Sequence, residues 1–357
     1  MKNLLKIGIG VGLLFAIVSV PFPFYFLPNL SYATSDSLLM FQVVLIALVS
    51  GFIVGCFLGR KLEQQKTLTI LKTIIAYILS FYLFKYGFDK LFFNQFYFPE
   101  PNILHTPVGH LSKDILFWSS MGSSYWYTVF MGIIEIVPAF LFLRKKTRLL
   151  GSFISFGILL NVWAINFGFN ISVKLLSSLL LLLSLYLVSF SYKRVYFVFT
   201  NNKIDEVEKD DAILKQKTFL NRVLKSILIS FFAIEILLPH IEKEERGTIT
   251  VSPESFTVIN VTSGAKFMQD IKRIHIHSKG WVILEDIHQN FKDYSFQVHP
   301  TNSSFELKGK KINLKIHSSN KRPTLTWLEN GDLKICVLEQ IDLSRMSLKD
   351  DRSNWIF

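Results

Sequence analysis

Long apolar runs dominate the first two thirds of the chain. A bilayer core about 30 Å thick needs about 20 apolar residues of helix, so runs of this length with few charges indicate membrane spans. Such runs are found at about 7–27, 38–58, 70–88, 127–143, 149–167, 174–191 and 223–240. The pattern therefore predicts an all-α polytopic membrane bundle of seven spans.

The pattern changes to period-two alternation beyond residue 240. Apolar and polar residues alternate in Ile274-His275-Ile276-His277, in 312–316 and in 333–337, as in half-buried strands. We expect a C-terminal all-β domain over 241–357, a small sandwich or barrel. In this pattern the imidazoles of His275 and His277 face solvent, and no carboxylate or cysteine pattern completes a ligand set, so we expect no metal.

Composition and charge fit this architecture. Half of the residues are hydrophobic, 18% are charged and the mean hydropathy is +0.36, which excludes a soluble enzyme and a disordered chain. The net charge of +12 comes mainly from residues 1–240. There, the N-terminus and the loops on one predicted side of the membrane contain 18 Lys and Arg, and the loops on the other side contain 3. This asymmetry predicts a cytoplasmic N-terminus, an inner-membrane location and a periplasmic C-terminal domain, and it explains the positive charge without nucleic acid as a partner.

The spans and loops predict five segments. These are two N-terminal membrane spans (1–69), a four-helix core (70–191), a cytoplasmic loop (192–222), a seventh span (223–240) and the β domain (241–357). The core contains an aromatic outer loop, 89–126, where Trp118, Tyr125 and Trp126 would suit the headgroup region. Ser112 is a candidate N-cap for a short amphipathic helix in this loop. We expect the loop to lie on the bilayer as a lid.

Several short motifs in the core carry a family resemblance. They are Phe84-Lys85-Tyr86-Gly87 with Lys90, Met121-Gly122-Ser123, Gly132-Ile133-Ile134-Glu135, the basic run 144–151, Asn161 with Asn166, and Val173-Lys174-Leu175. In order and spacing, residues of about 70–191 resemble the DoxX-like group of small bacterial four-helix membrane proteins. Some members of that group are named as a subunit of a thiosulfate:quinone oxidoreductase. The resemblance implies a four-helix core and, for those members, a redox setting.

Ionisable residues within spans are expensive and usually face a bundle interior or a cavity. Counting residues along the spans places Lys85 and Glu135 at similar depth, so we expect them to pair. The expected intramembrane polar cluster consists of Lys85, Asp89, Lys90, Glu135, Asn161, Asn166 and Lys174. Such a cluster either fastens helices together or forms a pocket for a compact ligand such as a quinone-like head group.

These features leave two classes of function open. The first is a membrane component that binds or assembles with other membrane or periplasmic proteins through its exported β domain. The alternative is a redox-associated or ligand-handling subunit that uses the outward-facing polar cluster. We favour the first class, with the bilayer as a further partner, no catalytic activity of the chain on its own and no resident cofactor. A quinone belongs only to the alternative.

Overall fold

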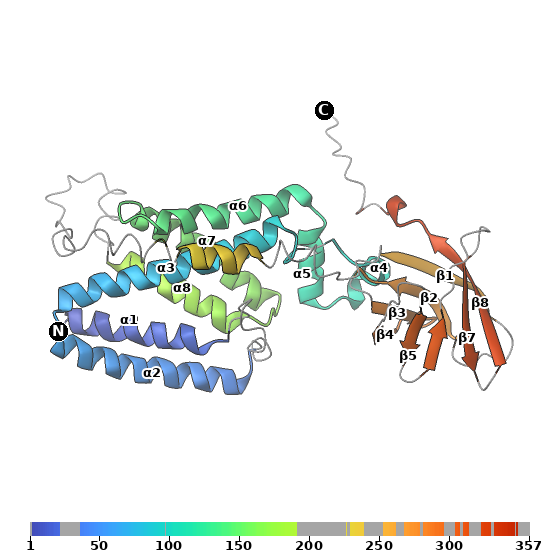
Figure 1. Ribbon diagram of the computed structural model, residues 1–357, viewed down its shortest axis with the longest axis horizontal. Coiled ribbons are helices and arrows are strands. Elements are labelled where there is room, and N and C mark those ends of the chain that lie inside the picture. Colours follow the sequence, from blue (N-terminus) through green and yellow to red (C-terminus); the bar gives the residue numbers. More distant parts are fainter. Residues whose placement is uncertain are drawn as a thin grey trace, which may run out of the picture. The chain divides into compact units, whose positions relative to one another are not determined.

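The chain folds into two compact units. The computed structural model describes residues 2–21, 36–96, 98–190, 226, 229–238, 253–261, 268–278, 281–295, 304–307, 310–313, 323–329, 332–346 and 348 (Figure 1). Unit 1 comprises Met1–Phe96 and Tyr125–Glu242, and unit 2 comprises Tyr97–Ser124 and Lys243–Phe357. Unit 2 therefore combines most of the expected outer loop with the C-terminal region. The expected cytoplasmic loop 192–222 lies outside the described residues.

Unit 1 is helical. Its labelled helices are α1 (Lys2–Ser19), α2 (Leu38–Lys61), α3 (Gln64–Leu91), α6 (Tyr125–Phe142), α7 (Arg148–Gly168) and α8 (Lys174–Ser189). Five of these, all except α8, are long and apolar enough to cross a membrane, which indicates an integral membrane protein. The expected sixth and seventh spans correspond to shorter apolar helices, α8 and Ile229–Leu238. At 1.5 Å per residue, α8 is about 24 Å long, somewhat less than a bilayer core.

Close backbone contact joins α1 and α2. A Cβ on Gly55 would lie 2.8 Å from the Cα of Gly8, so these helices approach at positions where glycine leaves room. α1 ends at Ser19, two residues before Pro21, and the last part of the predicted first span, 22–27, lies outside the described residues. A proline cannot donate a backbone hydrogen bond, and the helix ends before it.

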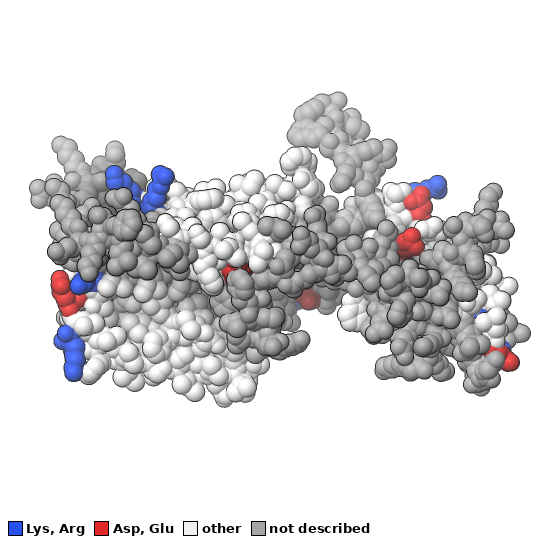
Figure 2. Space-filling view, viewed as in Figure 1, with Lys and Arg blue, Asp and Glu red and all other residues white. Residues whose placement is uncertain are grey.

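The centre of unit 1 lies around α3, which packs against α1, α6 and α8. Ile75, Leu79 and Leu183 are fully buried there. The Ser80 hydroxyl donates a 2.8 Å hydrogen bond to the backbone carbonyl of Ala139, next to Pro138 in α6. On the face seen in Figure 2, the described surface of the helices is mostly uncharged, and lysine and arginine gather at the end where the N-terminus lies.

Unit 2 contains short helices and strands. The first segment forms α4 (Pro101–His105), a 3-10 turn (Val108–His110) and α5 (Lys113–Gly122). The strands are β1 (Glu254–Val261), β2 (Ile271–Ile276), β3 (Trp281–Asp286), β4 (Phe291–Ser295), β5 (Ser304–Leu307), β6 (Lys310–Asn313), β7 (Thr324–Glu329) and β8 (Asp332–Ile341), followed by a 3-10 turn (Leu343–Arg345). α5 starts after Ser112, as predicted, but the Ser112 hydroxyl bonds to the Asp114 carboxylate rather than to a backbone amide.

The described strands form one antiparallel sheet in the order β4-β3-β2-β1-β8-β7-β6-β5. Phe256, Ile274, Cys336 and Leu338 are buried together on one face of it. The prediction of a C-terminal β region is confirmed. The expected sandwich or closed barrel is replaced by an open sheet. The strands β1 to β4 pair in succession, β5 to β8 pair in succession, β1 pairs with β8, and β4 and β5 are the two edges.

α4 covers part of the opposite face of the sheet, where it packs against β1 and β2. Ile274, His275 and Ile276 are consequently all buried, although they alternate between the two faces. The prediction that the His275 imidazole faces solvent is therefore wrong. The prediction from alternation assumes that one face of the sheet is exposed to solvent. Here α4, about 170 positions earlier in the chain, covers part of that face.

Candidate functional site

A buried ion pair joins α3 to α6 in unit 1. The amino group of Lys90 lies 2.7 Å from a carboxylate oxygen of Glu135, and both side chains are almost fully buried. The two helices touch at Gly87 and Gly132, where a Cβ on Gly132 would lie 2.9 Å from the carbonyl oxygen of Gly87. Helical side chains lean toward the N-terminus of their own helix, so in this antiparallel pair they converge across the contact.

The Lys90 amino group has its donor positions satisfied. Besides Glu135, it donates to the Gln95 side-chain oxygen at 2.8 Å and, more weakly, to the Tyr86 carbonyl at 3.5 Å. The Phe96 ring centroid lies 5.3 Å from the same nitrogen, a cation–π distance. A buried charge with this set of partners is well suited to fastening two helices.

Lys85 does not pair with Glu135. Its amino group lies 2.5 Å from Asp89, one turn further along α3. Lys85 and Lys90 are five residues apart, so they point about 140° apart around the helix, and only Lys90 faces the Gly87–Gly132 contact. The predicted partner of Glu135 is therefore wrong: it is Lys90 and not Lys85. The depth of a residue in the membrane does not determine which side of its helix meets the neighbouring helix.

The remaining polar residues of the expected cluster separate into different environments. Asn166 is buried in α7, whereas Asn161, five residues earlier, is exposed. Lys174 contacts the side chain of Asn170 at 2.9 Å and the carboxylate of Asp36 at 3.8 Å. Their contacts do not join them to the Lys90–Glu135 pair.

Asp36 is a residue that the sequence reading missed. Its carboxylate accepts hydrogen bonds from the backbone amides of Lys174 at 2.8 Å and Leu175 at 3.0 Å, and so caps the start of α8. An acidic residue just before α2 suggests a cap for α2. Because the helix that Asp36 caps begins 138 residues later, the sequence around Asp36 does not indicate this role.

The three expected headgroup aromatics occupy both units. Trp118 is half-buried in α5 and packs edge-to-face on Phe117, with ring centroids 5.5 Å apart. Tyr125 and Trp126 begin α6 and are exposed, and Tyr125 stacks on Phe93 at 5.1 Å. Tyr97–Ser124 belong to the same unit as the sheet, and within this segment α4 packs against β1 and β2. That the loop lies on the bilayer as a lid stays a prediction.

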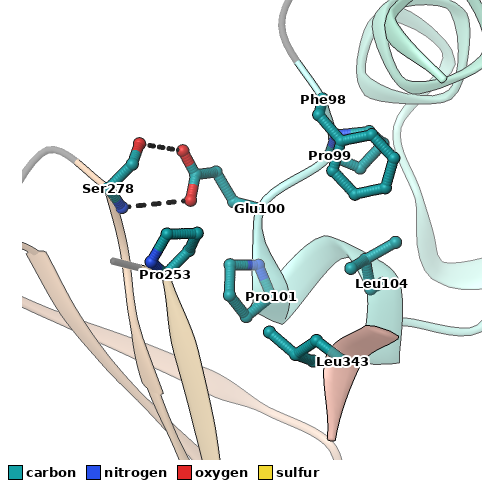
Figure 3. A pocket seen from close by; sticks show the side chains of 8 residues that line it. All are labelled: Phe98, Pro99, Glu100, Pro101, Leu104, Pro253, Ser278 and Leu343. Atoms are coloured by element: carbon teal, nitrogen blue, oxygen red, sulfur yellow. Dashed lines mark hydrogen bonds between the residues drawn. The ribbon is translucent and has the colours of Figure 1, made fainter. Parts of the chain in front are cut away.

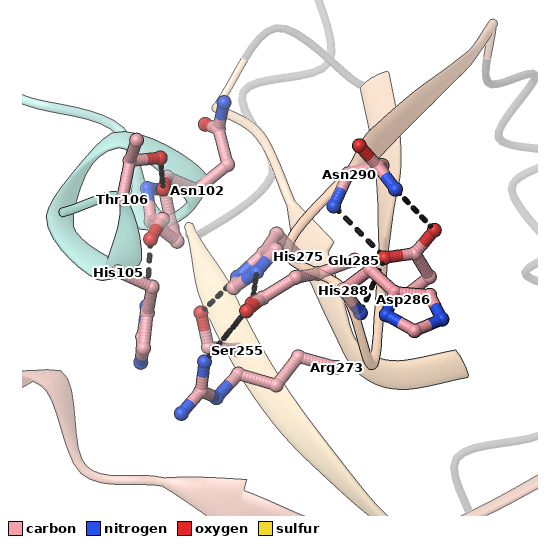
Figure 4. A network of polar contacts seen from close by, with 11 residues as sticks. Asn102, His105, Thr106, Ser255, Arg273, His275, Glu285, Asp286, His288 and Asn290 are labelled. Atoms are coloured by element: carbon pink, nitrogen blue, oxygen red, sulfur yellow. Dashed lines mark hydrogen bonds and ion pairs between the residues drawn. The ribbon is translucent and has the colours of Figure 1, made fainter. Parts of the chain in front are cut away.

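A second polar network lies in unit 2, between α4 and the sheet (Figure 4). His275 contacts the Ser255 hydroxyl through Nδ1 at 2.8 Å and the Glu285 carboxylate through Nε2 at 3.1 Å. Arg273 donates to both oxygens of Glu285, at 2.8 and 3.1 Å. The His105 ring of α4 lies 5.0 Å from that of His275. Burial, the main cause, lowers the pKa of His275 to about 4, so the imidazole is neutral at pH 7.

This Ser–His–Glu arrangement has the residue types of a hydrolytic triad but not its properties. A neutral His275 donates from Nε2 to Glu285, which leaves Nδ1 to accept the Ser255 proton. However, Ser255 and His275 are both 0% exposed, and Arg273 already neutralises Glu285. A nucleophile needs access to a substrate, so this network is structural.

A small cavity lies beside α4 in the same unit (Figure 3). Its volume is about 200 Å³, and its apolar walls are Phe98, Pro99, Pro101, Leu104, Pro253 and Leu343. Glu100 and Ser278 provide its polar groups. Among the described residues, no group of three or more His, Cys, Asp and Glu is arranged to hold a metal ion.

Sequence comparison relates part of this chain to a bacterial protein. The chain is 32% identical over 127 residues to "Uncharacterized protein YwoB" of Bacillus subtilis (strain 168), a match that covers 36% of this chain and 80% of that protein. The chain belongs to the family of YwoB. No protein-family model matches the chain, and no solved structure matches it. Membership of the YwoB family establishes common descent for part of the chain. The name of YwoB states no activity, so it indicates none for this chain.

Proposed function

We propose that this member of the YwoB family is a membrane-anchored binding or assembly subunit of a cell-envelope complex, and that unit 2 is its binding module. The observation that carries the proposal is that unit 2 consists of two segments distant in the chain, Tyr97–Ser124 and Lys243–Phe357, which fold together. A module built from two distant segments is connected to the helices at three points of the chain. Such a construction suits a binding surface attached to a membrane anchor.

The folding of these two segments into one unit also supports the proposed orientation of the chain in the membrane. Two segments that pack together lie on one side of the membrane, so the chain between Ser124 and Lys243 crosses an even number of times. α6 and α7, together with the shorter helices α8 and Ile229–Leu238, supply four crossings when both short helices also span. The gathering of basic residues at the helix ends near the N-terminus favours a cytoplasmic N-terminus and an exported unit 2.

We further propose that residues 70–191 form a DoxX-like core to which two N-terminal spans, a seventh span at 223–240 and the C-terminal domain at 241–357 are attached. The pairing of α3 with α6 and of α7 with α8 is compatible with a four-helix core. The alternative function, handling of a quinone-like or other small ligand, is favoured by the burial of the Lys90–Glu135 pair, because ionisable residues inside membrane helices are often functional.

Purification in mild detergent distinguishes the two functions. An assembly subunit is expected to co-purify with a defined envelope protein in stoichiometric amount, and a variant lacking residues 245–357 is expected to insert in the membrane but lose this companion. A ligand-handling subunit would instead retain an extractable quinone that is lost on changing Lys90 or Glu135. Retention of the companion by the truncated variant would contradict the assembly proposal.

A further inference from the structure

The cavity of unit 2 combines apolar walls with a buried acid. Glu100 is 6% exposed and lies at one end of the cavity, beside Ser278, while the apolar side chains come from both segments of the unit (Figure 3). Three of the wall residues are prolines, which are rigid and provide no side-chain donor. The walls alone therefore favour a compact apolar group.

The partners of Glu100 leave its charge incompletely matched. The carboxylate accepts hydrogen bonds from the backbone amide of Ser278 at 3.1 Å and from the Ser278 hydroxyl. Its ion-pair contact among the described residues is with Nδ1 of His277 at 3.4 Å, which carries charge only when the imidazole is protonated. A buried carboxylate is far more stable beside a cation than beside neutral donors alone.

We propose that this cavity is a binding site for a small organic ammonium compound with an apolar body. The ammonium group pairs with Glu100 at the polar end, and the apolar body fills the space between Pro101, Leu104 and Leu343. This site is separate from the proposed envelope partner, because it takes a small ligand between α4 and the C-terminal segment of unit 2.

The volume limits the size of the ligand. A cavity of roughly 150 Å³ accommodates one benzene ring, so 200 Å³ accommodates a single ring with a short substituent. Benzylammonium has this size and charge, and benzyl alcohol is a neutral analogue of nearly the same shape. The difference in their affinities isolates the contribution of the Glu100 charge.

The experiment is a titration of the full chain in mild detergent with each compound at pH 7, followed by calorimetry. Benzylammonium is expected to bind saturably and at least about tenfold more tightly than benzyl alcohol, as a charge-assisted hydrogen bond requires. Glu100→Gln, which keeps the shape of the side chain, is expected to abolish this preference. Glu339→Gln, a change at an exposed carboxylate of β8, is the matched control and leaves it intact.

A second variant tests the cavity itself. Leu104→Trp fills the space and is expected to abolish binding of both compounds, whereas Leu116→Trp, at an exposed leucine of α5, leaves binding unchanged. Equal affinity for the two compounds, absence of saturable binding, or binding that survives Leu104→Trp would overturn the proposal. If Glu100→Gln does not fold, the contrast between the two tryptophan variants decides.

Discussion

Lys90 and Glu135 are each 3% exposed, so each depends on the other for charge compensation. Removing one partner leaves an unpaired charge in an apolar setting, whereas removing both leaves no buried charge. We predict that Lys90→Met and Glu135→Gln each lower the free energy of unfolding by about 3–5 kcal/mol and that the double variant loses much less than the sum. Unfolding in mixed detergent micelles measures this.

Lys85 is the matched control for this pair. Its pair with Asp89 is partly exposed, with side chains 18% and 16% accessible, so Lys85→Met is expected to have a smaller effect. Lys85→Met and Glu135→Gln should also be additive within about 0.5 kcal/mol. Strong coupling between Lys85 and Glu135 would show that the lysine assignment is wrong.

His275 is expected to make unit 2 sensitive to acid. Its pKa is about 4 in the folded protein and close to 6.5 when unfolded, so the unfolded chain takes up the proton first. The contribution of the neutral imidazole is therefore fully present above pH 6.5 and is lost as the pH falls toward 4, by about 3 kcal/mol in all.

Thermal unfolding of the full chain in detergent at pH 7.5, 6 and 4.5 checks this expectation. His275→Asn should be less stable at pH 7.5 and should lose less stability on acidification than the parent does. His288→Gln, a change at an exposed histidine, should retain the parent's pH dependence. Identical pH profiles for the parent and His275→Asn would exclude His275 as the cause.

At the scale of elements, the sheet protects its buried face. Cys336 in β8 is 0% exposed, and burial raises the pKa of its thiol to about 12, so little reactive thiolate forms. In a Cys56→Ser background, we predict no labelling of Cys336 by a charged maleimide in the native protein and full labelling after denaturation. Rapid labelling of the native protein, measured by mass spectrometry, would mean that β8 does not pack as described.

The elements differ in how far the sequence predicts them. Bilayer thickness makes apolar runs a reliable guide to α1, α2, α3, α6 and α7. Rotation about a helix axis is set by contacts such as Gly87 with Gly132, so the partner of Glu135 could not be deduced from depth. The burial of His275 depends on α4, and the cap supplied by Asp36 serves α8. Both come from distant parts of the chain, where local periodicity carries no information.

At the scale of the whole molecule, the two segments of unit 2 must be on the same side of the membrane. Reporter fusions after Phe357 and within the 106–112 region are therefore expected to be active outside the cytoplasm, and a fusion near Asp210 is expected to be active inside it. The basic asymmetry predicts the same arrangement. Opposite locations for the first two fusions would be incompatible with a unit made of both segments.

The most direct test of the two-segment unit is a photo-crosslink. Leu104 of the first segment and Pro253 and Leu343 of the second line one cavity. With benzoylphenylalanine in place of Leu104 in the full-length membrane protein, peptide mapping should find an intramolecular crosslink near residue 253 or 343. The exposed Val108 position, as control, should give little of this product. Crosslinks from position 104 to lipid alone, with none to the C-terminal segment, would contradict the account.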